Sequence, residues 1–508
     1  MGAFLYREGA LFSSGHPGGA PFLNALQPAA PPERGDPMYN VKSLDSNEFI
    51  DHGEVLESLE EGRRLSTNMD EVNRILNKAR EKHGLTHREA AVLYYVEDED
   101  VRAQIHALAR EIKEHIYGRR IVMFAPLYLS DYCVNGCRYC GFHAQNKTPR
   151  RKLTMDELRE EVLALEQLGH KRLLLEAGED DRNCPIDYVT ECMRTIYDTK
   201  LKNGSIRRVN VDIAATTAEN YRKLKDAGLG TYILFQETYH KPTYQFMHPS
   251  GPKSNYEWHT EAMDRGMMEG GLDDVGIGAL FGLYDWHYEV MGLLMHAEHL
   301  EAVVGVGPHT ISFPRILPAP GVDYGMFNLV NDRDFKHLIA VTRLAVPYTG
   351  MILTTRENEA FRRELLDIGM SQMSAGSCVG VGGYAHPERC ANDTPQFHLA
   401  DERHPMDVLK GLVRDGYLPS FCTACYRSGR TGDRFMPLAK SGEIASVCQP
   451  NAMLTFKEYL LDYADDELKA LGDKMIADEL QAIPRERRRD QTADFLKRLE
   501  AGERDLRF

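Results

Sequence analysis

The sequence lacks long apolar runs, is poor in cysteine and carries no excess of basic charge. Ten cysteines in 508 residues are too few for a disulfide scaffold, so we expect reduced thiols in a cytoplasmic protein. A formal net charge of −15 argues against a general nucleic-acid-binding role. No apolar run approaches the roughly 20 residues that span a bilayer. From these absences we expect neither nucleic acid nor a membrane as a partner. The 43% hydrophobic content is typical of a globular enzyme.

The first 37 residues differ in composition from the rest of the chain. The stretch "SSGHPGGAPFLNALQPAAPPERGDP" is rich in Gly, Pro and Ala and has no periodic apolar face. It has neither a secretory nor a transit-peptide pattern. We therefore predict that residues 1–37 are a disordered tail or result from a misassigned start, because Met38 opens a sequence of ordinary helical character.

The pattern of the chain predicts three regions beyond this tail. Residues 38–120 read as an N-terminal helical segment, and residues 405–508 as a helical C-terminal domain with a cysteine-bearing loop. Between them, over residues 121–404, eight strand-like segments alternate with amphipathic helices, as in a (β/α)₈ TIM-type barrel; an open doubly wound sheet is the alternative. The expected strands are 121–129, 172–179, 208–215, 231–238, 275–283, 309–316, 350–357 and 369–377.

Three cysteines follow the first expected strand in "YCVNGCRYCGF", at Cys133, Cys137 and Cys140. The loop after a barrel strand opens onto the face where barrel enzymes do their chemistry. Structural zinc requires four ligands; His143 is an available fourth, but a C-x₃-C start is unusual for zinc. Three buried, inert thiols would be poor core composition here. A [4Fe–4S] cluster held by three thiolates leaves one iron open, and this reading is favoured.

A second trio stands near the other end of the chain, at Cys422, Cys425 and Cys448 in "SFCTACYRSGRTGDRFMPLAKSGEIASVCQPNA". Zinc is a stronger alternative here, because C-x₂-C is common in zinc sites. However, no histidine follows His404 and no cysteine follows Cys448, so a fourth ligand would have to come from far away. The count of ligands again favours a [4Fe–4S] cluster with an open position.

The first cysteine loop resembles the radical S-adenosylmethionine (SAM) superfamily. The resemblance implies that SAM binds the open iron through its amino and carboxylate groups and is cleaved to a 5′-deoxyadenosyl radical. It also implies that Tyr139 packs near the adenine. The tripeptide Ala177-Gly178-Glu179 in "LLLEAGED" resembles the superfamily element that binds the SAM amino group; a plain strand-to-helix turn is the alternative.

A closer resemblance extends from about Glu54 to Phe508. The chain resembles the HydG family of tyrosine lyases in [FeFe]-hydrogenase maturation, through such segments as "APLYLSDYCVNGCRYCGF", "TYILFQETYHKPTYQFMHPSGPK", "FGLYDWHYEV", "VPYTGMILTTRE" and "SFCTACYRSGRTGDRF". The resemblance implies cleavage of L-tyrosine to p-cresol and dehydroglycine. The fragment then yields CO and cyanide at the second cluster, which carries an additional labile iron. An iron–carbonyl–cyanide unit bound to cysteine is the implied product.

The same resemblance implies a reducing electron donor and, as partners, the maturation proteins HydE and HydF and the hydrogenase itself. Two alternatives remain from the sequence. The 2-iminoacetate synthase of thiamine biosynthesis shares the tyrosine chemistry but lacks the C-terminal cysteine trio. A non-catalytic iron–sulfur or zinc scaffold is the alternative from a different class of protein.

The labile iron needs a ligand from the protein, and histidine is the expected type. His296 and His299 lie on an expected helix, where core or surface roles are more usual. His309 begins the sixth expected strand in "GPHTISFPR" and is preferred. Alternation along the strand places His309, Ile311, Phe313 and Arg315 on one face; if that face points inward, His309 lies at the barrel bottom and Arg315 near the SAM site.

Two arginines are candidates for binding the carboxylate of tyrosine. Arg356 ends the seventh expected strand in "ILTTRE", and Arg315 is the alternative. A bidentate guanidinium–carboxylate contact would fix the orientation of the substrate. Either residue is equally able to form an internal salt bridge.

Overall fold

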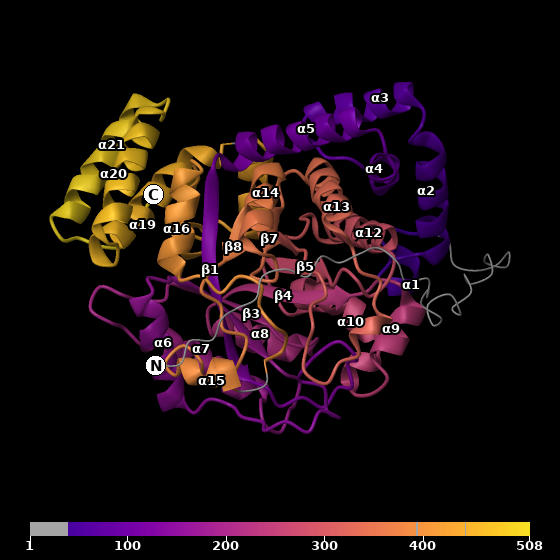
Figure 1. Ribbon diagram of the computed structural model, residues 1–508, viewed down its shortest axis with the longest axis horizontal. Helices are drawn as coiled ribbons and strands as arrows, with labels where there is room; N and C mark the ends of the chain where they lie inside the picture. The colour runs from indigo at the N-terminus through magenta and orange to yellow at the C-terminus, as the bar shows by residue number, and fades with distance from the viewer. Residues whose placement is uncertain (1–38, 393–394, 442) are drawn as a thin grey trace, which may run out of the picture.

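The computed structural model describes residues 39–392, 395–441 and 443–508, so the predicted tail at residues 1–37 lies outside the described residues. Its centre is a closed barrel of eight parallel strands (Figure 1). Strand β1 pairs with both β2 and β8, which closes the sheet. The predicted (β/α)₈ barrel is therefore confirmed, and an open sheet is excluded. The eight strands are β1 Arg120–Ser130, β2 Arg172–Ala177, β3 Arg208–Asp212, β4 Leu229–Glu237, β5 Val275–Ala279, β6 Thr310–Ser312, β7 Gly350–Leu353 and β8 Gln372–Ser374.

Helices alternate with these strands and begin where the sequence signals them. Helix α6, Met155–Gln167, starts with a complete capping box between Thr154 and Glu157, which satisfies free N–H groups of the first turn. Its apolar side, including Leu158 and Val162, is buried against the barrel. The other helices between or after the strands are α7 Ile186–Asp198, α8 Ala218–Asp226, α9 Lys241–Met247, α10 Tyr256–Thr260, α11 Ala262–Asp264, α12 Trp286–Val304, α13 Asp332–Ala345, α14 Glu359–Ile368 and α15 Pro387–Asn392.

The N-terminal helices lie against the outside of the barrel's helical layer (Figure 1). They are α1 Ser46–Phe49, α2 His52–Leu65, α3 Met69–Arg80, α4 His87–Tyr94 and α5 Glu99–Tyr117. The buried ring of His87 lies between two carboxylates, at 2.8 Å from Glu54 Oε1 and 2.7 Å from Glu298 Oε2. Because Glu298 belongs to α12, this contact fastens the N-terminal segment to the barrel.

The C-terminal region contributes a strand that the sequence did not predict. Strand β9, Leu418–Ser420, pairs in parallel with the first residues of β1, so the barrel sheet gains a ninth strand. Pro419 within it has no N–H to donate, which suits a strand paired on one side only. The helices of this region are α16 Pro405–Arg414, α17 Ala424–Arg427, α18 Gly432–Lys440, α19 Ala445–Asp462, α20 Asp466–Gln481 and α21 Glu486–Glu500.

The barrel interior contains a small apolar cluster separate from the main core. We call it the apolar layer; its buried members are Phe124, Leu174, Ile233 and Ile352. Cavities lie on both sides of this layer. Below, the carboxyl-end cavity is the one lined by the last residues of the strands, and the amino-end cavity is the one lined by their first residues. No helix of the described residues is long and apolar enough to cross a membrane.

Candidate active site and metal centres

The first cysteine trio lines the carboxyl-end cavity. Cys133, Cys137 and Cys140 come from the loop after β1, and their sulfurs face a cavity that holds about 170 Å³ of solvent space. All three are free thiols; Cys137 is buried and the other two are partly buried. No three His, Cys, Asp or Glu side chains of the described residues are placed to hold a single metal ion. The three thiols line one and the same cavity, and their assignment to a cluster stays a prediction.

Glycine allows the cysteine loop to approach the end of β2. A Cβ on Gly178 would lie 2.3 Å from the carbonyl oxygen of Tyr132 and 3.0 Å from the Cβ of Cys133. Only glycine fits this contact without moving the backbone. Beside it, Asn135 Nδ2 donates a 2.6 Å hydrogen bond to Glu179 Oε2. The predicted SAM element at Ala177, Gly178 and Glu179 is thus placed against the cysteine loop and lines the same cavity.

Burial controls the protonation of these thiols. It raises the pKa of Cys140 to about 11, with a further contribution from the Cys133 thiol. It raises the pKa of Cys137 as well. A cluster must therefore displace their protons when it binds. Lys253 is the nearby cation that lowers the pKa of both thiols.

The other polar groups near the cysteines are already paired. Lys253 Nζ lies 2.7 Å from Glu237 Oε1. The hydroxyl of Tyr139 lies 2.9 Å from His248 Nε2, and the Tyr139 ring lines the cavity. The structure places Tyr139 in the cavity as expected, while its contact with adenine stays a prediction.

The two candidate arginines lie in different environments. Arg356, in the loop after β7, lines the carboxyl-end cavity, and its guanidinium carbon lies 3.3 Å from the ring centroid of Phe397. Arg315 instead pairs with Glu357 and, at 2.7 Å, with Asp332. It is not among the residues that line the cavity, so the structure does not support Arg315 as the carboxylate-binding alternative.

The sixth strand does not meet the condition that His309, Ile311, Phe313 and Arg315 all face the barrel interior. Ser312 lines the carboxyl-end cavity, whereas Ile311 and Phe313 belong to the core between the strands and the helices. His309 precedes the strand and reaches the other cavity. His309 and Arg315 therefore do not share one inward face.

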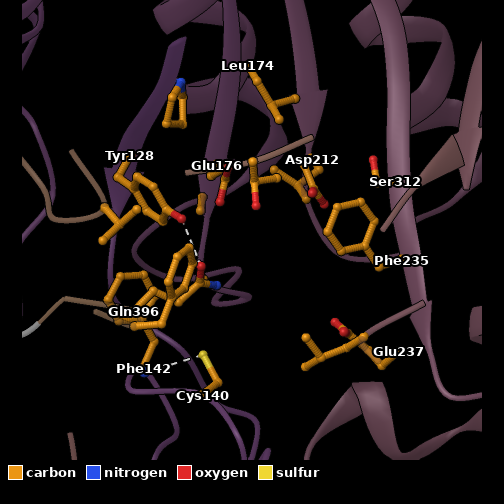
Figure 2. A pocket seen from close by; sticks show the side chains of 18 of the residues that line it. Tyr128, Cys140, Phe142, Leu174, Glu176, Asp212, Phe235, Glu237, Ser312 and Gln396 are labelled. Atoms are coloured by element: carbon orange, nitrogen blue, oxygen red, sulfur yellow. Dashed lines mark hydrogen bonds between the residues drawn. The ribbon is translucent and has the colours of Figure 1, made fainter. Parts of the chain in front are cut away.

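Two carboxylates in the carboxyl-end cavity were not predicted from the sequence. Glu176 lies near the end of β2 and Asp212 at the end of β3, and the strand register places them opposite each other. Both line the cavity and point into it (Figure 2). An acidic residue at or near the carboxyl end of each strand was the available signal, since barrel active sites are built from such positions.

The second cysteine trio lines the amino-end cavity, which holds about 70 Å³. Cys422 follows β9, Cys425 lies on α17 and Cys448 lies on α19, so three elements converge. His309 lines the same cavity. The structure thus brings together the preferred histidine and the three predicted ligands of the second cluster.

One of these thiols is predisposed to be a thiolate. A hydrogen bond from Cys448 lowers the pKa of Cys425 to about 6, against its burial, and Arg430 contributes in the same direction.

Arginines dominate the charge of the cavity. Its lining includes Arg120, Arg172 and Arg208, the first residues of β1, β2 and β3.

The environment of His309 fits a neutral metal ligand. Burial lowers the pKa of His309 to about 4, so its imidazole is neutral at physiological pH. Its Nδ1 has no hydrogen-bond partner in the part of the chain that the structure describes, and it lies 3.7 Å from Asp274 Oδ1. The other candidates, His296 and His299, lie on α12; His296 contacts the Tyr239 hydroxyl at 2.9 Å and His299 contacts Asp264 at 3.0 Å. They do not line the amino-end cavity.

Comparisons with known protein families agree with this fold and site. A family model of the radical SAM superfamily matches residues 127–283, and a model of the Biotin and Thiamin Synthesis associated domain matches residues 312–418. A closed parallel barrel with three cysteines after its first strand, within such a match, defines a radical SAM enzyme.

The solved structures narrow this class further. A crystal structure of HydG, titled a maturase of the [FeFe]-hydrogenase, is 57% identical, with a TM-score of 0.88, covering 91% of this chain and 100% of that chain. HydG from Carboxydothermus hydrogenoformans is 37% identical, with a TM-score of 0.77, covering 89% and 99%. The 2-iminoacetate synthase of Escherichia coli (strain K12) is 30% identical over 62% of this chain and 81% of its own length. The chain belongs to the HydG family.

Proposed function

We propose that this protein is a radical SAM tyrosine lyase of [FeFe]-hydrogenase maturation. It cleaves L-tyrosine to p-cresol and dehydroglycine and converts the second fragment to CO and cyanide. One observation carries the proposal: two cysteine trios lie at opposite ends of one barrel interior, the second beside His309. Two separate metal centres suit a reaction with two separate stages.

The carboxyl-end cavity has residues for the first stage. Cys133, Cys137 and Cys140 would hold a [4Fe–4S] cluster, and Ala177, Gly178 and Glu179 lie where SAM would bind. When bound, the cluster and SAM supply a 5′-deoxyadenosyl radical. The chain's own residues then orient tyrosine, and Arg356 is the group we assign to its carboxylate.

The amino-end cavity has residues for the second stage. Cys422, Cys425 and Cys448 would hold the second [4Fe–4S] cluster, and His309 would bind the labile iron together with a free cysteine. The three arginines of this cavity favour anions, which suits a site that receives an acidic fragment. Its product would be an iron–carbonyl–cyanide unit for the hydrogenase, passed on with HydE and HydF as partners.

One preparation tests the proposal. Anaerobically reconstituted protein with SAM, tyrosine and dithionite should form p-cresol, then CO and cyanide, and should bind iron rather than zinc. SAM cleavage without any p-cresol would contradict it.

The related 2-iminoacetate synthase activity is the second candidate, favoured by the 30% identity with the Escherichia coli enzyme. That activity predicts p-cresol without CO or cyanide, so gas analysis of the same reaction separates the two candidates.

A further inference from the structure

The carboxyl-end cavity holds three charged groups without an ionic partner. They are Glu176, Asp212 and Arg356, contributed by β2, β3 and the loop after β7. Other charged side chains at this end of the barrel are paired with each other; Lys253 Nζ, for example, lies 2.7 Å from Glu237 Oε1. In the described part of the chain, no salt bridge involves any of the three. All three side chains are partly buried, and removing an unpaired charge from water is costly, so their presence in a cavity indicates a charged ligand.

The remaining contacts of these groups are neutral. The Tyr128 hydroxyl lies within hydrogen-bonding reach of the Glu176 carboxylate and 2.8 Å from Gln396 Oε1. The Asp212 carboxylate makes no hydrogen bond to the described residues. The Arg356 guanidinium stacks on Phe397 at 3.3 Å and makes one long contact, 3.5 Å, with a backbone carbonyl. Its planar fork is therefore free for a bidentate contact.

The two carboxylates share their negative charge. Burial raises the pKa of Glu176 to about 7; burial and the neighbouring Glu176 raise that of Asp212 well above its usual value. Tyr128 and Arg356 face Glu176, while Glu237 and Lys253 face Asp212, so the surrounding charges are of both signs. Two carboxylates at facing positions of neighbouring strands do not both ionise easily, so each favours the protonated form of the other.

We propose that Glu176 and Asp212 bind the ammonium group of the amino-acid substrate and take a proton from it, while Arg356 holds the substrate carboxylate. The inference rests on the proposed function. In the step, one N–H bond of the ammonium breaks, its electron pair stays on nitrogen, and the proton forms an O–H bond on the carboxylate pair. The total charge is unchanged, and the substrate nitrogen becomes a neutral amine.

The proton transfer has a chemical reason. Loss of a hydrogen atom from an ammonium group would leave a positively charged nitrogen radical, whereas loss from a neutral amine leaves an uncharged one. A carboxylate with a raised pKa is also a better base, because its proton affinity lies closer to that of the amine. The proposed role thus accounts for two acidic groups that line this cavity without a salt bridge to any described residue.

The experiment uses the variants Glu176→Gln and Asp212→Asn in the reconstituted enzyme. The control is Glu219→Gln, an exposed carboxylate on α8 with 76% of its side chain accessible. Each cavity variant should lower kcat for p-cresol formation at neutral pH by about 100-fold or more, as for a lost general base. The loss should shrink as pH rises towards the pKa of the tyrosine ammonium, because solution then supplies the neutral amine. A loss that is the same at every pH, or no loss, would overturn the proposal.

A binding measurement covers the case in which a variant reconstitutes poorly. The probes are L-tyrosine and 3-(4-hydroxyphenyl)propionate, which has the same carboxylate and phenol but no amine. The wild-type protein should prefer tyrosine, and both cavity variants should lose that preference, while Arg356→Gln weakens both ligands alike. An unchanged preference in Glu176→Gln and Asp212→Asn would overturn the subsite. Failure of the proposed function is distinguishable, since it would appear as absent p-cresol in the wild-type protein.

Discussion

Each of the two cavities is lined by three cysteines, but the structural elements that supply them differ. The charged residues around the cysteines differ in sign as well. At the carboxyl end, one loop supplies all three cysteines, and acidic residues prevail on the strands. At the amino end, the cysteines come from three elements of the C-terminal region, and arginines prevail. Strand β2 shows the contrast within one element, since Arg172 faces one cavity and Glu176 the other. The difference shows that one barrel can place an acidic cavity and a basic cavity at the two ends of the same strands.

The largest effect should follow loss of the carboxyl-end centre. Cys133→Ser removes one of three ligands of the first cluster, so p-cresol, CO and cyanide should all fall below detection. Product analysis with iron quantification measures this. Cys184→Ser, at a free thiol outside both cavities, is the matched control and should leave all products. Substantial p-cresol from Cys133→Ser would break the assignment of this cavity to the first stage.

Loss of the amino-end centre should affect only the second stage. The double variant Cys422→Ser, Cys425→Ser should still form p-cresol at a rate within a few-fold of wild type, but no CO. Trapping of CO together with chromatography of p-cresol measures both. Loss of p-cresol with unchanged CO would reverse the roles of the two cavities.

A smaller and more local effect is expected at His309. His309→Ala should keep the irons of both four-iron clusters and lose the additional one, because no other histidine lines this cavity in the described residues. Iron analysis and electron paramagnetic resonance of the second cluster measure this. His296→Gln, on α12, serves as the comparison variant; if it rather than His309→Ala removes the labile iron, the ligand assignment is wrong.

The smallest effects on stability are expected when one glycine at each cavity is replaced by alanine. A Cβ on Gly178 meets the backbone of Tyr132 at 2.3 Å, whereas a Cβ on Gly350 meets the end of the Gln372 side chain at 2.4 Å, which can move. Gly178→Ala should therefore cost about 1–3 kcal/mol and reduce iron at the first cluster. Gly350→Ala should cost less. Thermal unfolding with iron content tests both, and equal effects would contradict the difference in packing.

Much of the fold was predictable because the barrel strands are apolar runs separated by helices with clear caps. The capping box of Thr154 and Glu157 and the positive φ of Gly228 after α8 occur where the sequence signals them. Strand β9 was not predicted, since three residues around Pro419 give no periodic signal.

The candidate site was predictable where chemistry depends on spacing, and not where it depends on orientation. The six cysteines that the spacing groups into two trios line two cavities, while the clusters they would hold stay a prediction. The inward face of β6 could not be read, because every residue of this strand is buried and alternation carries no polarity. For the same reason, the sequence did not predict that Glu176 and Asp212 line the cavity. Their position depends on which residues of β2 and β3 point into the barrel.

The apolar layer between the cavities is one side chain deep on each strand that contributes to it. On β1, β2 and β7, the residue that lines one cavity and the residue that lines the other are two positions apart, roughly 7 Å along the strand. An ion entering this layer would have to shed its hydration at a cost of several kcal/mol, a cost that an uncharged molecule does not meet. The apolar layer therefore opposes the passage of ions between the two cavities more strongly than the passage of neutral molecules.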